Sequence, residues 1–92
     1  MNVRRVVLDV DKSVNRPTLV ELANAISAVP GVEGVNILVT EMDVGTMGMN
    51  ITVEGQNIDY DELLQVVENT GAAVHSIDEI AVGKRLIENK RP

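Results

Sequence analysis

The order in which hydrophobic residues change their spacing constrains the fold of this chain more than any other feature. A spacing of two residues is typical of strands, and a spacing of three to four is typical of amphipathic helices. The sequence predicts strands at 3–11, 32–43, 49–55 and 72–82, and helices at 17–29 and between Asp59 and Gly71. This β-α-β-β-α-β order predicts a ferredoxin-like α+β sandwich, in which a four-stranded antiparallel sheet carries both helices on one face.

Residues with strong positional preferences mark the ends of the two helices. Pro17 suits the first turn of the first helix, because its missing N–H costs nothing there, and the pair at 30–31, Pro-Gly, ends that helix. Asp59 is expected to cap the second helix, with Glu62 three residues later, and Gly71 is expected to end it in the left-handed conformation.

The length of 92 residues is that of one domain. We expect a ferredoxin-like domain at 1–83 and a charged tail at 84–92 that forms a short helix or a frayed end. A hairpin connection with two glycines is expected at 44–48.

Composition excludes several classes of function. The chain has no cysteine, which excludes disulfides, zinc–thiolate sites and cysteine nucleophiles. No apolar run is long enough for a membrane span, and the first residues enter a strand pattern directly, so we expect a cytoplasmic protein without a signal peptide. The net charge is −6, and residues 17–83 contain eleven acids but no Lys or Arg. Such a surface repels nucleic acid and attracts cations or the basic ends of another subunit.

Pairing of the first and last strands brings chemically sensible groups together. With the usual strand order 4-1-3-2, placing Asp9 opposite His75 also sets Arg5 opposite Glu79. Asp78 would then lie on the helix-covered face, which is unfavourable for a carboxylate and predicts a bulge near residue 77.

The face of the sheet without helices is expected to carry apolar side chains among polar ones. Strand alternation assigns Val7, Leu38, Met42 and Ile77 to this face. An uncovered face with several apolar side chains indicates a partner surface, and self-association is the leading interpretation.

Two groups of acidic residues are candidate ligands for a divalent cation. Hard cations such as Ca²⁺ bind six to eight oxygen atoms, so Ca²⁺ is favoured over Mg²⁺ or Zn²⁺, and a site where two subunits meet supplies oxygens most easily. The alternatives are that the acids are only solvated and that His75 pairs with Asp9. The first group is Asp9, Asp11, His75, Asp78 and Glu79, and the second is Glu41 and Asp43.

Several segments together resemble an archaeal family known as domain-of-unknown-function family 211. They are Val-Leu-Asp at 7–9, Gly-Val-Glu-Gly-Val-Asn at 31–36, Glu-Met-Asp at 41–43, the acidic start of the second helix at 59–62, and His-Ser-Ile-Asp-Glu at 75–79 with Gly83. The resemblance implies the ferredoxin-like fold and a homo-oligomer, and it supplies no activity.

Other families with this topology do not fit. Heavy-metal-associated domains need a Cys-x-x-Cys pair, and RNA-recognition modules need aromatic residues on their strands, whereas the only aromatic residue here is Tyr60. One histidine and no phosphate-binding loop leave little for catalysis, so no enzyme is predicted.

The sequence therefore predicts a non-enzymatic binding protein that forms a homo-oligomer and holds a divalent cation near subunit contacts. One alternative is a small-molecule sensing module that resembles ACT domains, with its effector beside residues 30–31 and the loop that precedes the first helix. The other alternative is a purely structural assembly without a ligand.

Overall fold

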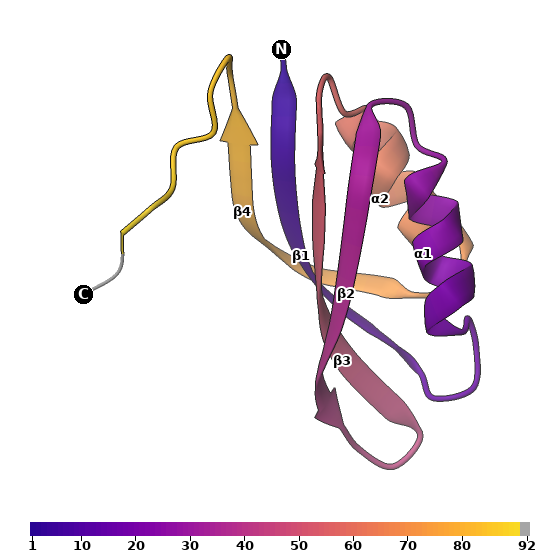
Figure 1. Ribbon diagram of the computed structural model, residues 1–92. Coiled ribbons are helices and arrows are strands. Elements are labelled where there is room, and N and C mark those ends of the chain that lie inside the picture. The colour runs from indigo at the N-terminus through magenta and orange to yellow at the C-terminus, as the bar shows by residue number, and fades with distance from the viewer. Residues whose placement is uncertain (91–92) are drawn as a thin grey trace.

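The computed structural model describes residues 1–90, and its elements follow the predicted order (Figure 1). The strands form one antiparallel sheet in the order β2-β3-β1-β4, and both helices cover the same face of it. The ferredoxin-like prediction is therefore confirmed. The elements are β1 (Val3–Ser13), α1 (Leu19–Ser27), β2 (Val32–Met42), β3 (Thr46–Gly55), α2 (Tyr60–Asn69) and β4 (Ala73–Val82).

The core lies between the helices and the two central strands, β1 and β3. Alternate residues of both strands point into it and are fully buried, and each helix adds two more fully buried side chains. Each such side chain stabilises the fold by roughly 1.5–3 kcal/mol relative to its exposed state. These residues are Val6, Leu8, Val10, Met49, Ile51, Val53, Leu22, Ile26, Leu63 and Val67.

Helix α1 begins two residues later than predicted because Thr18 caps it. The Thr18 hydroxyl accepts a hydrogen bond from the Glu21 backbone N–H at 3.1 Å, and the Glu21 carboxylate accepts one from the Thr18 N–H at 2.9 Å. The Thr18 N–H lowers the pKa of Glu21, because it hydrogen-bonds the charged form. Pro17 is buried just before this capping box rather than in the first turn.

Helix α2 has the predicted ends. The Asp59 carboxylate accepts a hydrogen bond from the Glu62 N–H at 3.1 Å, and Gly71 has a φ of +101°.

Among the described residues, no helix is long and apolar enough to cross a membrane.

The two edge strands contain bulges. At each bulge the edge strand has one residue more than the strand with which it pairs. In β4 the pairing with β1 skips Asp78 and later skips His75, so the predicted bulge near residue 77 is confirmed. In β2 the pairing with β3 is irregular just before Gly34, as predicted, and it also skips Thr40, which was not predicted.

These bulges change the face on which two apolar side chains lie. Ile77 pairs with Leu8, which is fully buried, and Met42 pairs with Met47, which packs against the core. Directly paired residues point to the same face of a sheet, so Ile77 and Met42 lie on the helix-covered side. Their predicted place on the open face is therefore wrong, because each bulge reverses the alternation beyond it.

The open face keeps two of the four predicted apolar residues. Val7 is half-buried in the middle of it, and Leu38 is exposed on β2. Their role in an oligomer interface stays a prediction. Because the other two residues leave this face, it is more polar than the sequence suggested.

The tail has neither helix nor strand over residues 84–90, so the predicted short helix is not formed there; residues 91 and 92 of the predicted tail lie outside the described part. Arg4 donates a hydrogen bond to the Lys84 carbonyl at 2.7 Å, and Arg5 binds Glu88. Figure 1 shows the tail leaving the end of β4 and running back beside it.

Candidate cation site

Charged side chains from all four strands gather on the open face of the sheet. Neither helix reaches this face, so its groups contact solvent (Figure 1). Acids outnumber bases there, which makes it the part of the molecule best suited to attract a cation.

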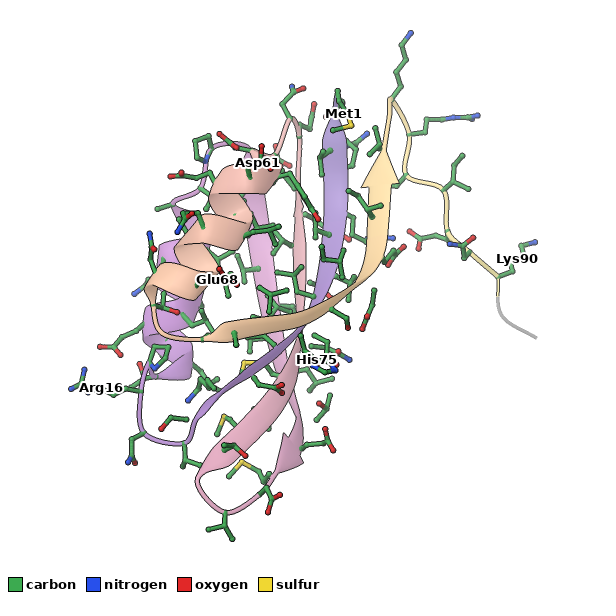
Figure 2. The ribbon with its side chains drawn as sticks, turned by 180° about the vertical axis from the view of Figure 1, so that it is seen from behind. Met1, Arg16, Asp61, Glu68, His75 and Lys90 are labelled. Atoms are coloured by element: carbon green, nitrogen blue, oxygen red, sulfur yellow. The ribbon has the colours of Figure 1, made fainter. Side chains whose placement is uncertain are left out.

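His75 interacts with Asp11 rather than with Asp9. The backbone register places Asp9 opposite Ser76, and His75 is the extra residue of a bulge. The His75 Nδ1 lies 3.9 Å from a carboxylate oxygen of Asp11, and both side chains are more than half exposed. The prediction that His75 faces Asp9 is thus wrong, because the bulge leaves His75 unpaired between Ser76 and Val74. Figure 2 shows His75 close to the point where the strands cross.

Asp78 and Glu79 already have partners. The Asp78 carboxylate accepts a hydrogen bond from the Ser76 hydroxyl at 2.7 Å. The Glu79 carboxylate lies 3.3 Å from the Arg5 guanidinium, as the predicted Arg5–Glu79 pair requires, although the backbone of Arg5 pairs with Ala81. These two acids therefore do not converge with Asp9 and Asp11 on one ligand position.

Arg5 connects β1 to β3, to β4 and to the tail. Its guanidinium lies 2.7 Å from Glu54 and 2.7 Å from Glu88, in addition to Glu79. Hydrogen bonds to Glu88 and Glu54 raise the pKa of Arg5 above its already high value. The hydrogen bonds between Arg5 and Glu88 also lower the pKa of Glu88. The two nitrogens that bind Glu88 make a bidentate pair, which fixes geometry as well as charge.

Asp11 instead meets the second predicted group, Glu41 and Asp43. The three carboxylates line a cavity of about 120 Å³ near the β2–β3 hairpin, together with Thr46, Met47 and Gly48. The sequence placed Asp11 in a different group, since it gave no register between β1 and the hairpin.

Gly48 provides the room between two of these carboxylates. A Cβ atom at this position would lie 3.2 Å from Asp11 Oδ1 and 3.5 Å from Glu41 Oε1. The backbone of Gly48 is not left-handed, so its conformation does not require glycine. A glycine inside a strand marks a close approach of other groups, and here both neighbouring strands bring an acid over it.

The turn of the hairpin holds Asp43 in place. Its side chain accepts a hydrogen bond from the Val44 N–H at 2.7 Å, and its own N–H donates to the Thr46 carbonyl at 2.9 Å. This hydrogen bond uses one lone pair of the Asp43 carboxylate, and the remaining lone pairs are available for a ligand.

A single chain does not complete a metal centre. Among residues 1–90, no three His, Asp or Glu side chains converge closely enough to hold a metal ion. The predicted ligands are thus divided into three that line one cavity, two that lie outside it without contacting each other, and two acids that bind other residues. In that order they are Asp11, Glu41 and Asp43; Asp9 and His75; and Asp78 and Glu79.

The turn at 30–31, proposed above for a small-molecule effector, is tightly packed. The space that a Cβ of Gly31 would occupy lies 2.5 Å from the backbone carbonyl oxygens of Gln56 and Asn57. The sensing function stays a prediction without support from this turn.

Comparison with known proteins identifies the family. The family model described as uncharacterized ArCR, domain-of-unknown-function family 211, matches residues 4–92. The chain belongs to this family. A relative, Uncharacterized protein MJ0319 of Methanocaldococcus jannaschii, is 39% identical over 89 residues, which cover 97% of this chain and 91% of the relative. The resemblance seen in the sequence is confirmed.

Two segments that carry the likeness to family 211 lie at the open face. Residues 41–43 supply two walls of the carboxylate cavity, and residues 75–79 include both bulged positions of β4. Neither the family nor the relative has a description that names a ligand or a reaction, so the chemistry must be argued from the residues.

Proposed function

We propose that this protein is a non-enzymatic, cytoplasmic binding protein that forms a homo-oligomer and holds a divalent cation near its subunit contacts. The cavity over Gly48 is the observation that carries the cation part of this proposal. It joins carboxylates from β1, from β2 and from the hairpin turn around a position that lacks a side chain.

The chemistry of these groups favours Ca²⁺. All three ionisable groups of the cavity are carboxylates, and Ca²⁺ accepts irregular sets of oxygen ligands, whereas Mg²⁺ needs near-ideal octahedral geometry. Zinc sites are usually built with imidazole or thiolate, and the one histidine lies beside Asp11 without lining the cavity.

Subunit contacts enter the proposal because one chain offers too few ligands. Ca²⁺ takes about six to eight oxygens, and the described side chains provide no converging set of three. Water molecules and oxygen atoms of a neighbouring subunit would fill the remaining positions.

The test is isothermal titration of metal-stripped protein with Ca²⁺, Mg²⁺ and Zn²⁺, together with native mass spectrometry. We expect stoichiometric binding of Ca²⁺ by the wild type. Asp11→Asn and Glu41→Gln should each weaken this binding at least tenfold. Gly48→Ala should weaken it without changing any charge, because the added methyl group enters the space between the two carboxylates.

Glu68→Gln is the matched control. It removes the same charge from the exposed face of α2, far from the cavity (Figure 2). Equal affinities for Glu41→Gln and Glu68→Gln would show that only net charge attracts the cation, and the site would be rejected. Absence of a stoichiometric mass gain in the wild type would reject it as well.

A further inference from the structure

Exposed apolar side chains gather at the end of the β2–β3 hairpin. Val44 is 96% exposed and Met42 is 64% exposed, and Val14 lies beside them, because its N–H donates to the Gly45 carbonyl. Figure 1 shows this hairpin reaching beyond both helices. We call Val14, Met42 and Val44 the hairpin tip.

A groove lined by both apolar and polar residues lies between β4 and the tail. The tail runs back beside β4 without a backbone hydrogen bond to it over residues 84–90, and a cavity of about 230 Å³ separates the two. This volume is several times the roughly 30 Å³ of one water molecule, so it has room for an aliphatic side chain. We call it the tail groove; its apolar walls are Ile80, Ala81, Val82 and Ile87.

The hairpin tip and the tail groove lie at opposite ends of the sheet. Val14 follows the last residue of β1 and is bonded to the hairpin, whereas Asn2 precedes its first residue and accepts a hydrogen bond from the Gly83 N–H. Strand β1 thus separates them by its whole length, and no chain can fill its own groove.

The charges of the two regions are opposite. Met42 and Val44 of the tip are flanked by Glu41 and Asp43, in a stretch without Lys or Arg. Val14 stands between two bases, but the Lys12 side chain is buried and Arg16 is paired with Glu21. Arg85 lines the groove, and Lys84 and Lys90 lie on the same tail, while the acids Glu79 and Glu88 are paired with Arg5.

We propose that the hairpin tip of one copy inserts into the tail groove of a second copy of this chain. Val44 and Met42 then contact Ile80, Val82 and Ile87, and Arg85 faces the acids beside the tip. The contact joins two different surfaces, so two joined copies still have one unoccupied tip and one unoccupied groove. Further copies can therefore add head to tail, and they form a ring or a chain. The inference rests on the self-association part of the proposed function and specifies the partner surfaces.

The test mixes two variants, each with one damaged surface. Val44→Asp damages the tip, Ile87→Asp damages the groove, and both side chains are exposed, so the fold tolerates the change. Val20→Asp is the matched control on α1, where Val20 is 69% exposed. Native mass spectrometry and sedimentation are done in EDTA, which separates assembly from cation binding.

We expect the wild type and Val20→Asp to assemble equally. Val44→Asp and Ile87→Asp should each weaken self-association roughly ten- to a hundredfold, the effect of losing one buried aliphatic contact. Their equimolar mixture should form a heterodimer that stops at two copies, because one intact tip and one intact groove remain.

Two results would overturn the proposal: assembly of Val44→Asp equal to that of Val20→Asp, or a mixture that stays monomeric. A wild type that is monomeric in EDTA overturns it too. Failure of the cation site alone leaves the assembly results unchanged, since Ca²⁺ binding is measured separately on the wild type.

Discussion

The two central strands of the sheet pair with each other without a shift, whereas the pairing of each edge strand is interrupted. β1 and β3 pair from Arg5 opposite Glu54 to Ser13 opposite Thr46. The pairing of β2 with β3, and that of β4 with β1, is interrupted by bulges, whose extra residues lie on the edge strands except for Arg4 at the very start of β1. All four strands belong to one sheet, so the difference follows from their positions in it.

A central strand is hydrogen-bonded on both sides, and an extra residue would break two ladders. An edge strand has one free side, so a bulge there disturbs one ladder only, and the added twist protects the edge from unwanted pairing. Strict alternation of side chains is therefore a reliable guide for β3 and for β1 from Arg5 onward. It fails beyond each bulge of β2 and β4, where Met42 and Ile77 change faces.

The largest expected effect compares isoleucines from the two kinds of strand. Ile51→Ala on β3 removes a fully buried side chain and should lower the free energy of unfolding by about 2–5 kcal/mol. Ile80→Ala on β4, where the side chain is 50% exposed, should lower it by less than about 1 kcal/mol. Urea denaturation of both variants in the Val44→Asp background, where self-association is weakened, measures both losses; equal losses would show that β4 contributes to the core as fully as β3.

Two glycines give the next comparison. A Cβ on Gly55, at the end of β3, would collide with the Gly31 carbonyl oxygen, so Gly55→Ala must displace backbone and should cost about 1–3 kcal/mol. Gly34, in the irregular start of β2, has free space and no left-handed φ.

Gly34→Ala should therefore be neutral or stabilise the fold by about 0.4–1 kcal/mol, because alanine restricts the unfolded chain. Thermal unfolding of both variants, followed by circular dichroism, gives the comparison. A marked loss of stability in Gly34→Ala would show that the bulged start of β2 is as tightly constrained as the end of β3.

The fold was predictable because each element carries its own periodicity and end signals. Asp59 and Gly71 marked the ends of α2 correctly. The capping box of Thr18 and Glu21 is also visible in the sequence, as a threonine followed three residues later by a glutamate. The prediction instead started the helix at Pro17, one residue before this cap.

The candidate site was predictable in composition but not in arrangement. Asp11, Glu41 and Asp43 were all named, but only the register across β1, β3 and β2 brings them to one cavity. Gly48 was the missed signal, since the sequence assigned it to the hairpin turn. The structure extends β3 to Thr46, which places Gly48 inside a strand between two acids.

A smaller effect tests the link between a central strand and the tail. Arg5→Gln removes the charge that holds Glu54, Glu79 and Glu88, and it should lower the free energy of unfolding by about 0.5–1 kcal/mol. It should also lower the backbone NMR order parameters of residues 84–90, because Glu88 loses its partner. The control Arg16→Gln changes an exposed arginine that has one distant partner, 3.6 Å away, and unchanged order parameters in both variants would contradict the link.

The smallest effect is the pH dependence of the tail contact. Arg5 lowers the pKa of Glu88 in the folded protein, so the contact is fully present above the unfolded pKa of a glutamate, about 4.3, and is lost as the pH falls through the lower folded value. NMR titration should show Glu88 protonating at a lower pH in the wild type than in Arg5→Gln, because the hydrogen bonds to the guanidinium are the main cause of the lowered pKa. If Glu88 kept its lowered pKa in Arg5→Gln, the contact with Arg5 would not be the cause of the shift.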